Sequence, residues 1–67
     1  MTPQQKAILK IMHDIHRDTG RPVPTVAVAV RYGMCPSGTR VYLRQMTAAG
    51  IITRIGQRCG YLPLLSA

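Results

Sequence analysis

Glycine and proline residues divide this chain of 67 residues into short segments. Pro3 and Pro36 suit the first turn of a helix, where a backbone N–H has no helical partner to lose. Gly20 and Gly50 suit the position just after a helix, where a left-handed backbone is common. Because so short a chain makes one domain at most, we expect a single domain over residues 1–67.

Residues 3–18 have the pattern of an amphipathic helix. Thr2 and Gln5 match a capping box of the T-x-x-Q kind. Apolar residues follow at the spacing i, i+3, i+4 and i+7, which places them on one helix face. These residues are Ile8, Ile11, Met12 and Ile15. We expect this face to lie in the core.

Residues 36–49 predict another helix, and residues 51–64 predict a hairpin. A strand would place Tyr42 and Leu43 on opposite faces, whereas a helix groups both with other core-type residues. The grouped residues are Thr39, Tyr42, Leu43 and Met46. After Gly50, two short apolar segments flank a glycine-bounded loop, which is typical of a β-hairpin.

The segment PTVAVAVRYGM, residues 24–34, allows two interpretations. Three valines alternate with alanines, which is the period of a half-buried strand. A helix over 25–32 would instead take its N-cap from the pair Pro24–Thr25 and end at Gly33.

We favour the helix, because it gathers one inward face, Val28, Ala29 and Tyr32. It leaves Ala27 and Arg31 outside and Val30 partly exposed. The expected fold is therefore mainly α with a small β-hairpin.

The charge balance indicates a polyanionic partner. Nine Lys and Arg residues face two Asp and Glu residues, a net charge of +7 at pH 7, and seven of the nine are arginines. The guanidinium fork suits phosphate and guanine, so nucleic acid is favoured over an acidic membrane surface or a merely solubilising charge. No segment reaches the ~20 apolar residues of a membrane span, and we expect a cytoplasmic protein.

The order helix, short helix, turn, helix, hairpin resembles winged helix-turn-helix DNA-binding domains. It is most similar to the N-terminal domain of LexA-type repressors, which carries T-x-x-Q, T-G-x-P-P-T and I-A-x-x-L-G. The matching residues here are Thr2, Gln5, Thr19, Gly20, Pro22, Pro24, Thr25, Val28, Ala29, Tyr32 and Gly33. The ending L-x-x-L-x-x-x-G-L-I of many winged-helix regulators is matched by Leu43, Met46, Gly50, Ile51 and Ile52.

The chain also departs from this family. One more residue separates Gly20 from Thr25, and the second helix and the turn after it are each about one residue shorter. The resemblance covers the DNA-binding domain alone, so it implies neither the self-cleavage nor the dimerisation of the repressors.

The resemblance implies that the helix at 36–49 enters the major groove of DNA. Its expected solvent face, flanked by Gln45, carries Ser37, Arg40, Val41 and Arg44. Arg40 or Arg44 can hold guanine O6 and N7, and Val41 can meet a thymine methyl group. The alternative is that Arg40 and Arg44 form only a solvated face. This alternative is disfavoured, because two like charges at i and i+4 without an acidic partner destabilise a helix.

Further contacts are expected outside this helix. Gln57 and Arg58, at the tip of the hairpin loop, can reach the DNA backbone or a minor groove, or form an ordinary turn. Arg54 and Arg31 suit phosphate contacts, which orient a protein without reading sequence.

No catalytic, metal or cofactor site is expected. His13 and His16 are expected to point outward, Cys35 and Cys59 lack C-x-x-C spacing, and Ser37 has no evident His or Asp partner.

Sequence-specific binding of double-stranded DNA is the favoured function, in a small transcriptional regulator or an accessory factor of a phage or mobile element. A monomer reads few base pairs, so a homodimer or a partner protein on DNA is expected. The alternative is a protein-interaction module that docks on an acidic partner.

Overall fold

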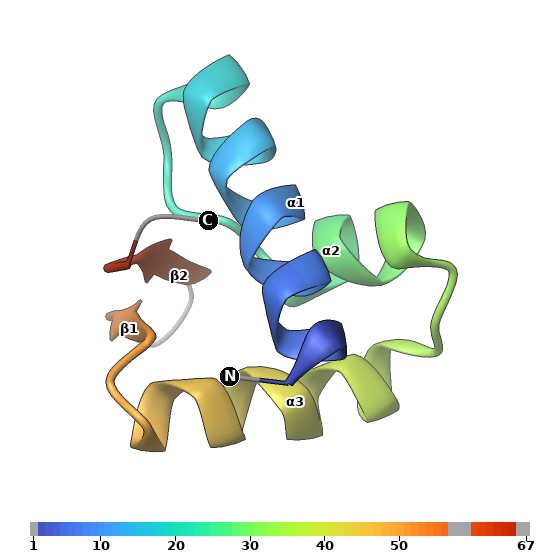
Figure 1. Ribbon diagram of the computed structural model, residues 1–67. Coiled ribbons are helices and arrows are strands. Elements are labelled where there is room, and N and C mark those ends of the chain that lie inside the picture. Colours follow the sequence, from blue (N-terminus) through green and yellow to red (C-terminus); the bar gives the residue numbers. More distant parts are fainter. Residues whose placement is uncertain (1, 57–59, 66–67) are drawn as a thin grey trace.

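The computed structural model describes residues 2–56 and 60–65. Within them, three helices precede an antiparallel hairpin of two strands (Figure 1). The elements are α1 Pro3–Thr19, α2 Thr25–Tyr32, α3 Pro36–Ala48, β1 Ile52–Ile55 and β2 Gly60–Pro63. This confirms the expected mainly helical fold with a small hairpin, in the winged-helix order. No helix in the described part is long and apolar enough to span a membrane.

Helix α1 begins with the predicted capping box. The Thr2 hydroxyl accepts the Gln5 amide at 3.1 Å, and the Gln5 side chain accepts the Thr2 amide at 3.2 Å. The helix ends one residue later than predicted, and Gly20 follows in the left-handed conformation with φ 67°. Of the predicted core face, Ile8, Met12 and Ile15 are buried and Ile11 is half-buried against the core. Leu9, which the spacing did not include, is also fully buried.

The valine-rich segment is a helix, so the alternating pattern is a misleading signal here. Val28 and Ala29 are 0% and 1% exposed, whereas Val30 is 76% exposed. Gly33, with φ 75°, closes the helix by donating its N–H to the Ala29 carbonyl at 2.9 Å.

The bounds of α2 match the predicted range 25–32, and its N-cap is Pro24, one of the predicted pair. One detail of the prediction for this helix is wrong. Ala27 is half-buried against the core and does not lie outside. The burial of Ala27 follows from the shortness of the helix, because an eight-residue element between α1 and α3 has few positions that stay clear of its neighbours.

Helix α3 buries the side that its pattern predicted. Leu43 and Met46 are fully buried, Tyr42 is half-buried, and the helix ends one residue before the predicted limit. The buried Thr39 hydroxyl donates to the Cys35 carbonyl at 3.1 Å, so burial leaves it no unsatisfied donor.

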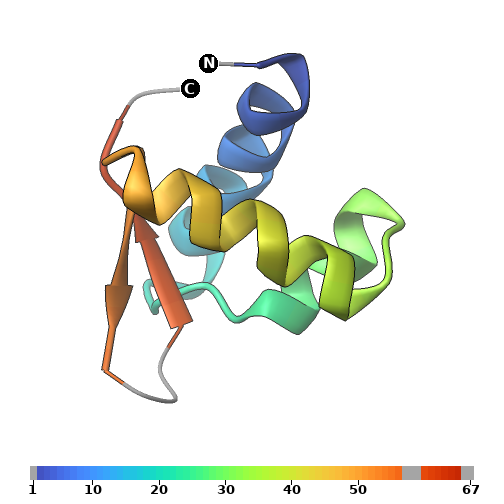
Figure 2. The same ribbon diagram turned by 90° about the horizontal axis from the view of Figure 1, so that it is seen from below.

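The hairpin is joined to the segment between α1 and α2. In the hairpin register Ile52 lies opposite Pro63 and Arg54 opposite Tyr61. Val23 forms an antiparallel bridge with Tyr61, with N–H···O distances of 2.7 and 2.9 Å, and its side chain is fully buried. Figure 2 shows this connector passing between the hairpin and α2, with α3 in front of them. The bridge therefore fixes the hairpin relative to α2.

At Gly60 the backbone of β2 passes close to the connector between α1 and α2. The φ of Gly60 is 105°, and a Cβ added there would lie 2.5 Å from the Val23 carbonyl oxygen. Any side chain would therefore have to push the connector away from β2.

We predict that Gly60→Ala lowers the free energy of unfolding by more than Gly20→Ala does. Gly20 also has a positive φ of 67°, but nothing lies within 4 Å of a Cβ added there, so alanine meets only the left-handed penalty of about 1–2 kcal/mol. Gly60→Ala adds the clash with Val23. Urea unfolding followed by circular dichroism measures both, and equal losses would contradict the role given to this contact.

Candidate nucleic-acid interface

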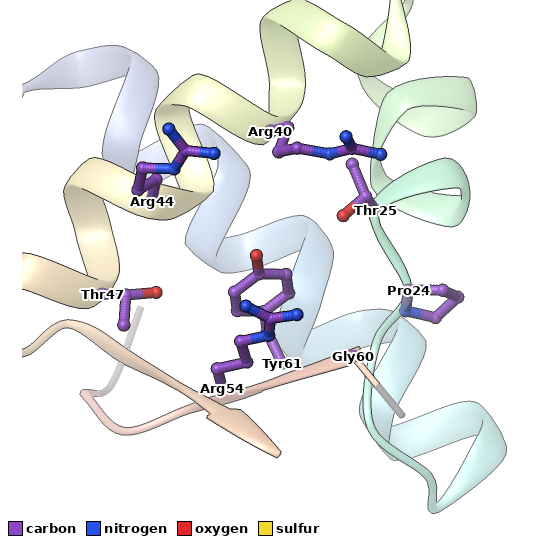
Figure 3. Close-up of a pocket in the computed structure, with 8 residues that line it drawn as sticks. All are labelled: Pro24, Thr25, Arg40, Arg44, Thr47, Arg54, Gly60 and Tyr61. Atoms are coloured by element: carbon purple, nitrogen blue, oxygen red, sulfur yellow. The ribbon is translucent and has the colours of Figure 1, made fainter. Parts of the chain in front are cut away.

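A hollow of about 530 Å³ lies where α3, the hairpin and the start of α2 meet (Figure 3). We call it the arginine groove. Its lining residues are Pro24, Thr25, Arg40, Arg44, Thr47, Arg54, Gly60 and Tyr61. They come from segments far apart in the sequence, so the groove exists only in the folded chain.

The helical repeat of α3 positions Arg40 and Arg44, and the alternation of side chains along β1 positions Arg54. Arg40 and Arg44 lie one turn apart on α3, and Thr47 continues the same side of the helix. Arg54 on β1 lies directly opposite Tyr61 on β2, so both side chains leave the same face of the hairpin. The helix and the hairpin therefore present their groups to one shared space.

Hydroxyl groups lie among the arginines. In Figure 3 the hydroxyl oxygens of Thr25, Thr47 and Tyr61 point into the space between them. Thr47 donates its proton to the Leu43 carbonyl at 2.8 Å, so toward a ligand in the groove it offers only an acceptor. Thr25 and Tyr61 carry hydroxyls that can donate to an anion.

The start of α2 adds to the positive potential of the groove. Its N-cap is Pro24, and in the described structure no side chain caps this end. Amide groups in the first turn of a helix carry partial positive charge and favour anions. This helix end supplements the guanidinium groups of the groove.

Negative charge is kept away from the groove. The two acidic residues of the chain, Asp14 and Asp18, both belong to α1, and Asp14 accepts from Arg17 at 3.1 Å. No lining residue of the groove is acidic. The arrangement therefore suits a ligand with several negative charges.

The structure brings together some of the predicted contact residues. Arg40, Arg44 and Arg54 line one groove, whereas Arg31 is exposed on α2 and does not line it. The other three predicted residues of α3 are exposed but lie outside the groove, namely Ser37, Val41 and Gln45. The predicted contacts Gln57 and Arg58 fall outside the described residues.

Five lining residues were not predicted: Pro24, Thr25, Thr47, Gly60 and Tyr61. The spacing from Arg40 and Arg44 could have indicated Thr47, because i+3 and i+7 positions share a helix side. Tyr61 and Gly60 depend on the hairpin register and the bridge to Val23, for which the sequence has no local signal.

We expected His13 and His16 to point outward, but both side chains form hydrogen bonds with backbone carbonyls. His13 Nε2 donates to the Leu65 carbonyl at 2.6 Å, and His16 Nδ1 donates to the Arg21 carbonyl at 2.9 Å. Both side chains are half-buried. In the part of the chain that the structure describes, no three His, Cys, Asp or Glu residues gather.

Cys35, at the start of α3, has a perturbed thiol. The Ser37 hydroxyl lies 3.1 Å from Sγ, and together with the backbone amides of Ser37 and Gly38 it lowers the pKa of the Cys35 thiol. These donors stabilise the thiolate, and the thiol is exposed.

No protein-family model matches the chain, and no curated protein matches its sequence significantly.

We predict that Cys35 reacts with iodoacetamide at lower pH than a free cysteine does, because the thiolate is the reacting form. Ser37→Ala removes the largest cause of the lowered pKa, so it should move the pH–rate curve upward. Both proteins would carry Cys59→Ser, so that a single thiol reports. Superimposed curves for the two proteins would contradict the assignment.

Proposed function

We propose that this protein binds double-stranded DNA, with α3 in the major groove and the arginine groove against the adjoining backbone. The observation that carries the proposal is the convergence of Arg40, Arg44 and Arg54 on one hollow without an acidic lining residue. Phosphate contacts by arginine supply most of the affinity in such complexes and orient the protein.

The shape of the neighbouring surface favours duplex DNA over a small anion. Beside the groove, the outer side of α3 is exposed over its whole length and carries small residues such as Ser37 and Ala48. The major groove is about 12 Å wide and admits a helix. A helix with a small-residue face can approach the base edges closely, while the groove beside it receives the strand that borders them.

The proposed role is that of a non-enzymatic, sequence-specific regulator of transcription, or an accessory factor of a phage or mobile element. This role places the protein in the cytoplasm, on the nucleoid. Because one α3 covers few base pairs, useful selectivity requires a second copy or a partner protein on the DNA.

We predict that affinity for a duplex falls steeply with salt, and that removing a groove arginine lessens this dependence. Each lost phosphate contact should reduce the slope of log K against log[salt] by about 0.9. Fluorescence anisotropy with a labelled duplex compares Arg40→Ala, Arg44→Ala and Arg54→Ala with the natural protein. Lys10→Ala is the matched control, because it removes one exposed positive charge from α1.

A slope near zero in the natural protein would contradict phosphate binding. A slope that falls equally in Lys10→Ala would show that general charge, and not the groove, binds the DNA. No binding of random duplex at micromolar protein and low salt would instead favour the other function that the sequence allows, docking on an acidic protein.

A further inference from the structure

We infer that Arg40 and Arg44 hold the DNA backbone together with Arg54, and that Val41 makes the base contact, to a thymine methyl group. This inference rests on the proposed function. It keeps the thymine contact that the sequence suggested for Val41 and replaces the expectation that Arg40 or Arg44 reads guanine.

The two flanks of α3 have different surroundings. Arg40, Arg44 and Thr47 share the flank that faces the hairpin and the start of α2. Val41 and Gln45 lie on the other flank, exposed and outside the groove. The arginines therefore belong to a concave surface, and Val41 to the convex side of the helix.

Because one flank of α3 is concave and the other convex, the two flanks can contact different groups of the DNA. The sugar–phosphate strand is a negatively charged ridge, which fits a hollow lined by guanidinium groups. Base edges are recessed in the floor of the major groove, so they are reached by residues that protrude from a helix. Arg40 and Arg44 are exposed but line the hollow, and in Figure 3 the Arg40 guanidinium lies beside Thr25, so these side chains are placed to meet the ridge.

Val41 is suited to the floor of the major groove. It is an apolar side chain 52% exposed on the protruding side of α3. Ser37 and Ala48, which lie on the same side of the helix, are small and do not screen it from an incoming surface. The C5-methyl of thymine is the apolar group that base edges present in the major groove. The structure therefore predicts selectivity for thymine without a requirement for guanine.

Modified bases test the two assignments separately, on the preferred duplex obtained by selection from a random pool. Replacing thymine by uracil removes only the methyl group and should weaken binding by about fourfold, the effect of one buried methyl group. Val41→Ala should abolish this difference. Replacing guanine by 7-deazaguanine removes the N7 acceptor and should leave affinity unchanged.

Matched variants complete the test. Val30→Ala makes the same change at an exposed valine of α2 and should retain the thymine effect. Arg40→Ala and Arg44→Ala should weaken the preferred duplex and a scrambled duplex by the same factor, because phosphates are common to both.

Several results would overturn the inference while leaving DNA binding intact. These are a loss of affinity with 7-deazaguanine, arginine losses confined to the preferred duplex, a selected site without thymine, and a thymine effect that persists in Val41→Ala. If no duplex binds at low salt, the proposed function itself fails and the inference with it.

Discussion

The bridge between Val23 and Tyr61 determines the geometry of this small protein. It joins the connector after α1 to β2 through two backbone hydrogen bonds, and the buried Val23 side chain anchors the connector in the core. Tyr61 in turn lies opposite Arg54 in the hairpin. The bridge thus sets the start of α2 on one side of the groove and Arg54 on the other. Without it, the hairpin would keep its own register and its packing against α1 and α3, but it would lose its backbone link to the connector that leads into α2.

Under the proposed function, the charges of the groove bind a ligand at some cost to stability. Arg40 and Arg44 are like charges at i and i+4, which destabilises an isolated helix by about 0.2–0.5 kcal/mol. The two side-chain carboxylates of the chain lie on α1, and neither lines the groove. A chain of 67 residues has a small margin of stability, so repulsion that a phosphate strand would relieve is more readily explained by binding than by folding.

The helices and the hairpin were predictable because each has a local cause. The Thr2–Gln5 capping box and the 3.6-residue periodicity of α1 and α3 operate within a few neighbouring residues. The valines of α2 show the limit of such signals. Their strand propensity predicts a strand, but the segment is a helix, because the helix buries Val28 and can end at Gly33 in the left-handed conformation. The groove was only half predictable. Its arginines were visible as charges, but their meeting depends on the Val23–Tyr61 bridge, a contact between distant segments.

Binding of DNA by α3 and the arginine groove can be tested by titrating nitrogen-15-labelled protein with a short duplex and following the amide chemical shifts. We predict that the largest shift changes fall on the exposed side of α3, on Arg54 and Tyr61, and on the first turn of α2. Amides on the exposed side of α1, including those of Lys6 and Lys10, should change little. Changes concentrated on α1, with the lining of the groove unaffected, would contradict this prediction.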